Sequence, residues 1–169
     1  MILYDVDRTT ASLTEIANLS ENGVITIINS IGINPIDNFM YGIQPGSPYR
    51  FYRVGRNGNV EFLGFITGLS GSNQAGAFDI HGNYYVTGSS QRLYRIDVNT
   101  RVATLVGTTN VTVSDIAIDP SNGDIFGWRR DPERLVRINP TNANVTILVQ
   151  LIHSMVVLEH YTMILIMVL

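Results

Sequence analysis

The chain has 169 residues, of which 45% are hydrophobic and 15% charged, a composition typical of one folded domain. Its net charge of −3 lacks the basic excess that binding to a phosphate backbone needs, so nucleic acid is not an expected partner. The absence of cysteine excludes disulfides, thiolate metal sites and thiol nucleophiles.

The first residues, MILYDVD, already have the pattern of a β-strand. They contain no charged segment followed by an apolar core and a cleavage site, so no signal peptide is visible. A second run follows at residues 11–17. Because residues 3–7 align with residues 93–97 further along the chain, we expect residues 1–20 to supply the two outer strands of a sheet.

A repeated phrase then divides the chain into units. The pattern Arg-x-x-Arg occurs at residues 50–53, 92–95 and 134–137, at a spacing of 42 residues. Each phrase is followed by a turn rich in Asn, Asp, Gly or Pro and then by an apolar run, which is typical of a β-hairpin. A second hairpin precedes each phrase. Each unit therefore holds four short strands, and the complete units span 31–66, 78–106 and 116–149.

Four antiparallel strands in a unit of about 42 residues are typical of a β-propeller blade. We therefore predict an all-β fold, a single propeller domain over residues 1–169. Residues 154–169 are an atypical tail that could form the two inner strands of the blade begun by residues 1–20. That pairing would close a ring of about four blades and remove its exposed sheet edges.

The tail leaves two other interpretations open. It lacks the Asn, Asp and Gly turn of the other inner hairpins, as expected of an incomplete fragment of a larger propeller. A membrane span over 147–169 is not favoured, because Gln150, His153, Glu159 and His160 interrupt the apolar run.

The phrases LYRIDVNT, FDIHGNYYVTG and DIAIDPSNGDIFG resemble propeller repeats of bacterial surface proteins that are classed only as a domain of unknown function. They are more distantly similar to propellers of the NHL, YVTN and gluconolactonase types. The resemblance covers about residues 1–150. It implies the propeller fold and an extracellular or cell-surface location. It implies no activity and no catalytic residue, because propellers host binding, lyase, lactonase and scaffold roles alike.

Residues that recur in every unit are expected to be scaffold. Arg53, Arg95 and Arg137 recur within strands, and we expect each of them to pair with carbonyls or carboxylates of a neighbouring blade, since a cation between sheets must be paired.

A second recurring set begins each of these strands at its loop end. These arginines either form a cationic arc on the rim or brace the loops. They are Arg50, Arg92 and Arg134.

The segment FGWRRDPER at 126–134 is the most individual part of the chain. We expect it to be one loop between the second and third strands, with Trp128, Arg129, Arg130 and Arg134 near its tip. Tryptophan and arginine on a loop are typical of binding hot spots. The alternative is a tryptophan that covers the blade edge within a self-neutralising charge cluster. With Arg92 and Arg50, these four residues are the ligand-binding candidates.

The alternative to a binding module is a metal-dependent propeller enzyme of lactonase or lyase type that acts on a small sugar-derived substrate. It would need ligands at the axial positions just before each inner strand, which read 29–30, 76–77, 114–115 and 153–154. Asp115 is the one carboxylate at these positions. It is a weak metal candidate, because hard cations need several oxygen ligands. His81 lies in a turn and has no evident partner in the sequence.

We therefore predict a non-enzymatic binding or structural module without a cofactor. Its ligand would be an unknown protein or carbohydrate, and the chain would be a monomer or an oligomer joined through sheet edges.

Overall fold

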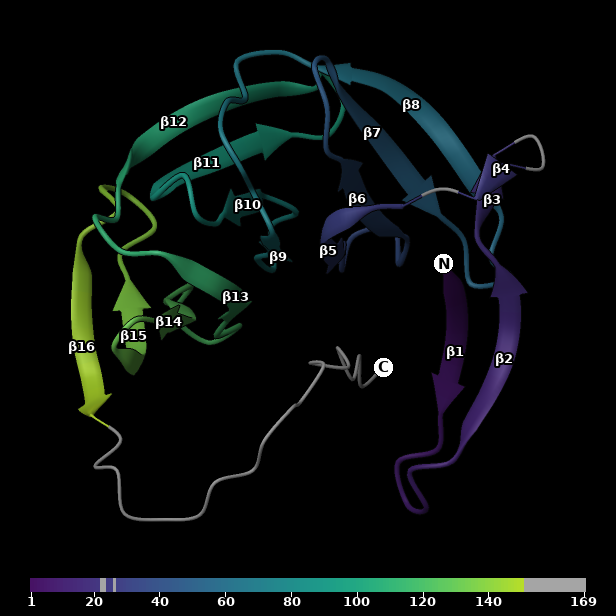
Figure 1. Cartoon of the computed structure of the whole chain (residues 1–169), viewed down its shortest axis with the longest axis horizontal. Helices are drawn as coiled ribbons and strands as arrows, with labels where there is room; N and C mark the ends of the chain where they lie inside the picture. Colours follow the sequence, from purple (N-terminus) through teal and green to yellow (C-terminus); the bar gives the residue numbers. More distant parts are fainter. Residues whose placement is uncertain (22–23, 26, 151–169) are drawn as a thin grey trace.

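The computed structural model describes residues 1–21, 24–25 and 27–150, and within these ranges the chain forms sixteen β-strands and no helix. Twelve of the strands form three sheets of four, and in each sheet consecutive strands pair antiparallel. Figure 1 shows the sheets following one another around an arc. The predicted all-β propeller fold is confirmed in this part of the chain.

Sheet 1 contains β5 (Asn29–Ile33), β6 (Met40–Gln44), β7 (Tyr49–Val54) and β8 (Val60–Ile66). Sheet 2 contains β9 (Ala75–Phe78), β10 (Tyr84–Thr87), β11 (Arg92–Asp97) and β12 (Val102–Thr108). Sheet 3 contains β13 (Val113–Ile118), β14 (Ile125–Arg130), β15 (Glu133–Ile138) and β16 (Val145–Gln150). The first strand of each sheet lies on the inside of the arc and the last on the outside (Figure 1).

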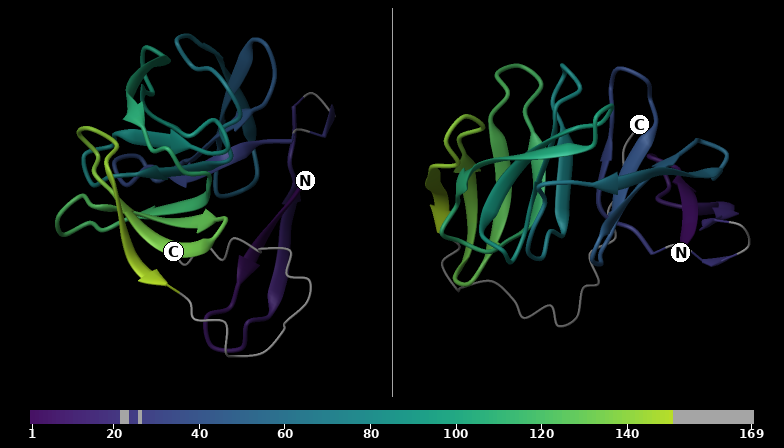
Figure 2. Two further views of the ribbon diagram at one scale, coloured as in Figure 1. Left: turned by 60° about the vertical axis from the view of Figure 1, so that its left-hand side comes forward. Right: turned by 90° about the horizontal axis from the view of Figure 1, so that it is seen from above.

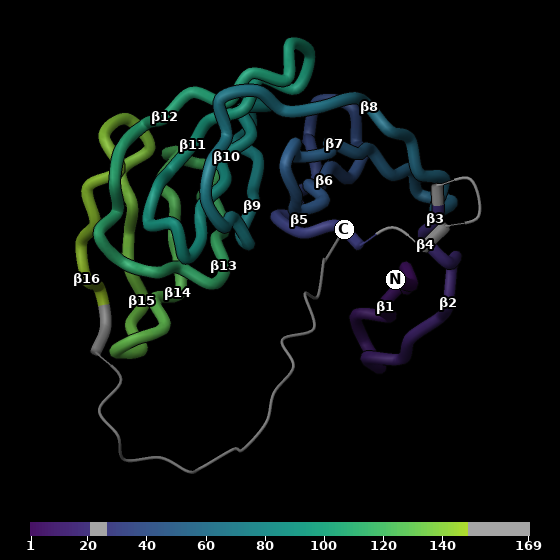
Figure 3. The backbone as a smooth tube through the Cα atoms, turned by 45° about the horizontal axis from the view of Figure 1, so that its top comes forward, coloured from purple at the N-terminus to yellow at the C-terminus, as the bar shows by residue number. Residues whose placement is uncertain are grey.

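The N-terminal segment forms a separate hairpin. Strands β1 (Ile2–Val6) and β2 (Leu13–Asn18) pair antiparallel, and Met1 and Leu3 pack against sheet 1. A short hairpin of β3 (Ser20–Glu21) and β4 (Val24–Ile25), which the sequence did not predict, follows it (Figures 2 and 3). The predicted inner strands of this sheet, at 154–169, lie outside the described residues, so ring closure stays a prediction.

The turn between the third and fourth strands has the same hydrogen-bond pattern in sheets 2 and 3. The side chain of Asp97 accepts hydrogen bonds from the backbone N–H groups of Asn99 and Thr100, both at 2.9 Å. Asn139 accepts one from Thr141 in the same way, at 2.8 Å. These turns end in a residue with positive φ, 60° at Arg101 and 61° at Ala143. The Asn and Asp residues at the starts of the predicted turns are therefore structural.

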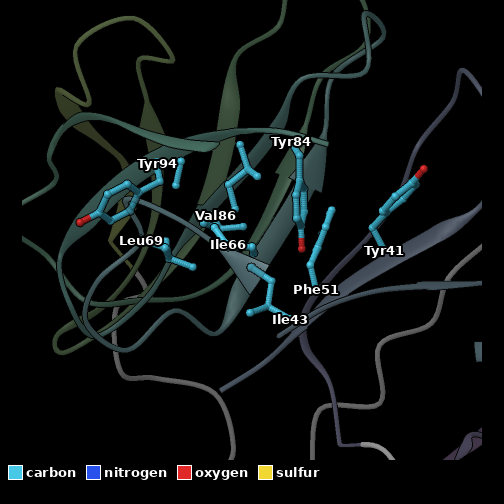
Figure 4. Close-up of a cluster of buried hydrophobic side chains, with 10 residues drawn as sticks. Tyr41, Ile43, Phe51, Ile66, Leu69, Tyr84, Val86 and Tyr94 are labelled. Carbon is cyan, nitrogen blue, oxygen red and sulfur yellow. The ribbon is translucent and has the colours of Figure 1, made fainter. Parts of the chain in front are cut away.

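The core between sheets 1 and 2 is aromatic (Figure 4). Tyr84 stacks on Phe78 with 4.5 Å between ring centroids and lies 6.0 Å from Phe51. Its hydroxyl donates a hydrogen bond to the backbone carbonyl of Ser30 in β5. Burial raises the pKa of Tyr84, so this hydroxyl stays a donor. A second core, which includes Leu93 and Val136, joins sheets 2 and 3.

Candidate functional site

The segment 126–134 is a hairpin rather than the predicted loop. Strand β14 continues to Arg130 and β15 begins at Glu133, so that only Asp131 and Pro132 form the turn. Trp128, Arg129 and Arg130 therefore lie within β14, and Arg134 lies within β15. The prediction was wrong because Arg129 pairs with Arg134 and Arg130 with Glu133, which extends both strands up to the turn.

Alternation places Trp128 and the arginine that follows it on opposite faces of sheet 3. Trp128 pairs with Leu135 across the hairpin, and both line a hollow of about 430 Å³. The hollow is mainly apolar. Its lining is Asp115, Ile116, Ala117, Phe126, Gly127, Trp128 and Leu135. Phe126 and Leu135 were missed as site residues: Phe126 lies two residues before Trp128, which is a visible signal, whereas Leu135 is brought opposite Trp128 only by the strand register.

The same face is fully covered in the other two sheets. By register, Leu135 corresponds to Phe51 in sheet 1 and Leu93 in sheet 2, and both of these are 0% exposed. Leu135 and Trp128 are instead partly exposed. The face of sheet 3 that carries Trp128 and Leu135 is thus apolar and not fully covered by the described residues.

Two arginines face each other at the tip of this hairpin. Arg129 and Arg134 are direct cross-strand partners. The Arg129 Nε donates to the Asp131 carbonyl at 3.0 Å, and an Arg134 terminal nitrogen donates to the Glu133 carbonyl at 3.1 Å. Neither guanidinium forms an ion pair with a carboxylate of the described chain. Arg130, the next residue, is exposed and pairs in register with Glu133.

The other two rim candidates, Arg50 and Arg92, also have partners among the described residues. The Arg50 guanidinium lies 4.3 Å from the ring centroid of Phe62, and its Nε donates to the Tyr52 hydroxyl at 2.6 Å. Arg92 donates to the Ser70 Oγ at 2.8 Å, which holds the loop between sheets 1 and 2. The six ligand-binding candidates are therefore divided among three sheets, and Trp128, Arg129, Arg130 and Arg134 alone share one hairpin.

Two of the three recurring mid-strand arginines, Arg53 and Arg137, pair with a carboxylate of their own sheet, not of a neighbouring blade as predicted. Arg53 forms a 2.6 Å ion pair with Glu61, directly opposite it on β8. Arg137 lies 3.3 Å from a carboxylate oxygen of Asp124. The correction follows from the sheet register, which brings a same-sheet carboxylate within reach before any other group.

Three of the four axial positions, 29–30, 76–77 and 114–115, lie inside β5, β9 and β13 rather than before them, and the fourth, 153–154, lies outside the described residues. Asp115 is half-buried, and the burial raises the pKa of its carboxyl group. Its Oδ1 accepts the backbone N–H of Ile116 at 2.9 Å. In residues 1–21, 24–25 and 27–150, no three His, Cys, Asp or Glu side chains gather closely enough to hold a metal ion.

His81 lies exposed in the turn between β9 and β10. Its backbone N–H donates to the Asp79 carboxylate at 2.9 Å.

Across the described ranges no helix has the length and hydropathy to span a membrane.

Solved structures confirm the architecture. The chain is similar to a chain of a nidogen/laminin complex, with 18% identity and a TM-score of 0.64 over 87% of this chain and 57% of that one. It is also similar to the calcium-binding protein regucalcin of Agrobacterium tumefaciens, with 18% identity and a TM-score of 0.57 over 85% and 52% of the two chains. TolB of Acinetobacter baumannii gives 15% identity and a TM-score of 0.54 over 89% and 38%. At these identities the likeness shows the fold alone, and the chain spans 38 to 57% of the length of these proteins.

No curated protein matches the sequence. A family described as a repeat of unknown function (DUF6923) matches residues 2–158, which is most of the chain and includes all three complete sheets. The chain is therefore a β-propeller repeat module that belongs to this family.

Proposed function

We propose that this module is a non-enzymatic protein-binding module of a secreted or cell-surface protein, and that it binds through the β14–β15 hairpin. The partner surface would place acidic side chains against Arg129 and Arg134 and an apolar group against Trp128. The observation that carries the proposal is the direct cross-strand pairing of Arg129 with Arg134.

Like charges directly opposite each other destabilise a sheet. At the same register position in sheet 1, Arg50 faces the neutral Gln44, and in sheet 2 the strand β10 ends before this position. Arg129 is therefore a departure from the pattern of the other two sheets. A carboxylate brought by a partner would turn the repulsion into two charge-assisted hydrogen bonds.

The apolar hollow beside the hairpin supplies the other part of the site. Trp128 and Leu135 are partly exposed at its edge, and tryptophan and arginine are the side chains most enriched at binding hot spots. A carbohydrate would need more polar groups than this lining offers, so the proposal favours a protein. The nidogen/laminin structure, a protein complex by its title, supports the same choice.

The sole tryptophan of the chain gives a direct test. A synthetic peptide of alternating glutamate and valine should change the emission of Trp128 on titration, and the peptide with lysine in place of glutamate should not. Arg129→Gln should lower the affinity for the glutamate peptide about tenfold, the loss expected for one charged hot-spot contact.

Arg8→Gln is the matched control, because it removes an exposed positive charge from the N-terminal hairpin and leaves the β14–β15 hairpin intact. Equal binding of both peptides, or equal weakening by both variants, would contradict the proposal.

A further inference from the structure

Sheet 2 carries a second hollow, of about 630 Å³, which the hairpin site does not use. It lies between the β9–β10 turn and the β11–β12 turn, and polar side chains from both turns and both outer strands line it. Its polar residues include His81, Asn83, Arg95, Asp97, Asn99 and Thr104. Its volume lies within the range of about 300–1,000 Å³ that is usual for sites of small ligands.

Comparison with the other sheets shows what is unusual about Arg95. In sheet 1 the residue opposite the equivalent arginine is Glu61, whose Oε2 accepts from the Arg53 Nε at 3.1 Å and from a terminal nitrogen at 2.6 Å. In sheet 3 the equivalent arginine pairs with Asp124, the residue before β14.

Both carboxylate positions are neutral in sheet 2. Thr104 lies opposite Arg95, and Asn83 is the residue before β10. Arg95 is exposed and has no ion pair with any carboxylate of the described residues. It is the one of the three recurring arginines whose internal carboxylate is replaced, and it is also the one that lines a polar hollow.

Asp97 and the Tyr85 phenol interact with the Arg95 guanidinium, and Asp79 interacts with the same phenol. Asp97 accepts the N–H groups of its own turn, at 2.9 Å each. Asp79 accepts two backbone N–H groups and the Asn83 side-chain amide, the last at 2.7 Å. Tyr85 is largely buried. The Arg95 guanidinium donates a hydrogen bond to the Tyr85 hydroxyl, and it has no ion pair with a carboxylate of the described residues.

We propose that this hollow, the Arg95 pocket, binds an acidic sugar, with Arg95 receiving the sugar carboxylate in the place that Glu61 occupies beside Arg53. The amide and hydroxyl groups of Asn83, Asn99, Thr100 and Thr104 would bond the sugar hydroxyls, since they offer both donors and acceptors. The pocket has few apolar side chains to receive a peptide, which favours a saccharide over an acidic protein segment.

The test uses three probes with the intact chain. Isothermal titration calorimetry should show binding of trigalacturonate, and little or none of galactotriose or triglutamate. Arg95→Gln should lower the affinity for trigalacturonate at least tenfold, the loss expected for a charge-assisted hydrogen bond. Thr104→Glu should do the same, because the new carboxylate would occupy Arg95 as Glu61 occupies Arg53.

Arg53→Gln is the control at the equivalent position of sheet 1, and it should leave the affinity unchanged. Thr104→Glu should fold at least as stably as the natural chain in a urea titration, so that loss of binding cannot come from unfolding. The proposal is overturned if trigalacturonate does not bind, if galactotriose or triglutamate binds as tightly, or if Thr104→Glu binds as the natural chain does. Because Trp128 lies in another sheet, its emission should not respond to trigalacturonate, which separates this site from the hairpin site.

Discussion

Asp115 is a half-buried carboxylate beside the apolar hollow of sheet 3, with one hydrogen bond from the Ile116 N–H. Desolvation penalises its charged form more than that one bond stabilises it, so its pKa is raised. A carboxyl group with a raised pKa binds its proton more tightly in the folded than in the unfolded state. Its contribution to stability is therefore lost as the pH rises from the unfolded pKa through the folded pKa.

Asp115→Asn should raise the free energy of unfolding at pH 7, because the amide keeps an acceptor for the Ile116 N–H and carries no charge. The gain over the natural chain should disappear below the unfolded pKa of aspartate, about 3.9, where both states are protonated. Urea titrations of both proteins at several pH values measure the difference. A gain that grows as the pH falls would show that the sign is wrong.

At the scale of strands, the inner strands of sheets 1 and 2 approach closely at one point. A Cβ on Gly76 would collide with the backbone carbonyl of Ser30 and would lie 3.0 Å from the Tyr84 hydroxyl. The same carbonyl accepts the Tyr84 hydrogen bond. This small residue lets β5 and β9 pack together and keeps a buried phenol satisfied.

Gly76→Ala should lower the free energy of unfolding by about 2 kcal/mol or more, because the obstruction is backbone and cannot rotate away. Gly55→Ala is the matched control, since its nearest neighbour is the side-chain oxygen of Asn57 at 3.0 Å, which can move. Thermal or urea unfolding measures both variants. An equal, small effect of the two substitutions would refute the proposed close contact.

Strands were predicted more reliably than their ends. The 42-residue spacing of the arginine phrases was sufficient to predict the repeated four-stranded sheets, because turn chemistry and apolar runs recur in every unit. The ends of β14 were not predictable in this way, since Arg129 and Arg130 look like loop residues until their register with Arg134 and Glu133 is known. The partners of Arg53 and Arg137 also depend on register, which a single sequence does not reveal.

At the scale of the whole molecule, three similar sheets follow one another on one arc (Figure 1). The residue at one register position can therefore be compared among the three sheets. The recurring pairs Arg53 with Glu61 and Arg137 with Asp124 hold their own sheets. Arg129 and Arg95 depart from this pattern in opposite ways, one by adding a cation and the other by losing a carboxylate. Departures of this kind are expected where a binding site has been placed on a repeated scaffold.

The metal-dependent alternative is tested at the same scale. Calcium at millimolar concentration should leave the melting temperature unchanged, because no described cluster of carboxylates could hold the ion. A differential scanning fluorimetry series with and without chelator measures this. A rise of several degrees with calcium would favour the enzyme over the binding module.

We infer that the recurring arginines that have a carboxylate partner, Arg53 and Arg137, stabilise the fold, whereas Arg95 and Arg129 serve binding. Urea unfolding of four variants, Arg53→Gln, Arg137→Gln, Arg95→Gln and Arg129→Gln, tests it most directly. The first two substitutions should each lower the free energy of unfolding by about 0.5–1 kcal/mol, the usual contribution of a partly exposed ion pair. Arg95→Gln should lose less than either, and Arg129→Gln should be as stable as the natural chain or more stable. The opposite order, with Arg95 and Arg129 the costly losses, would contradict the account.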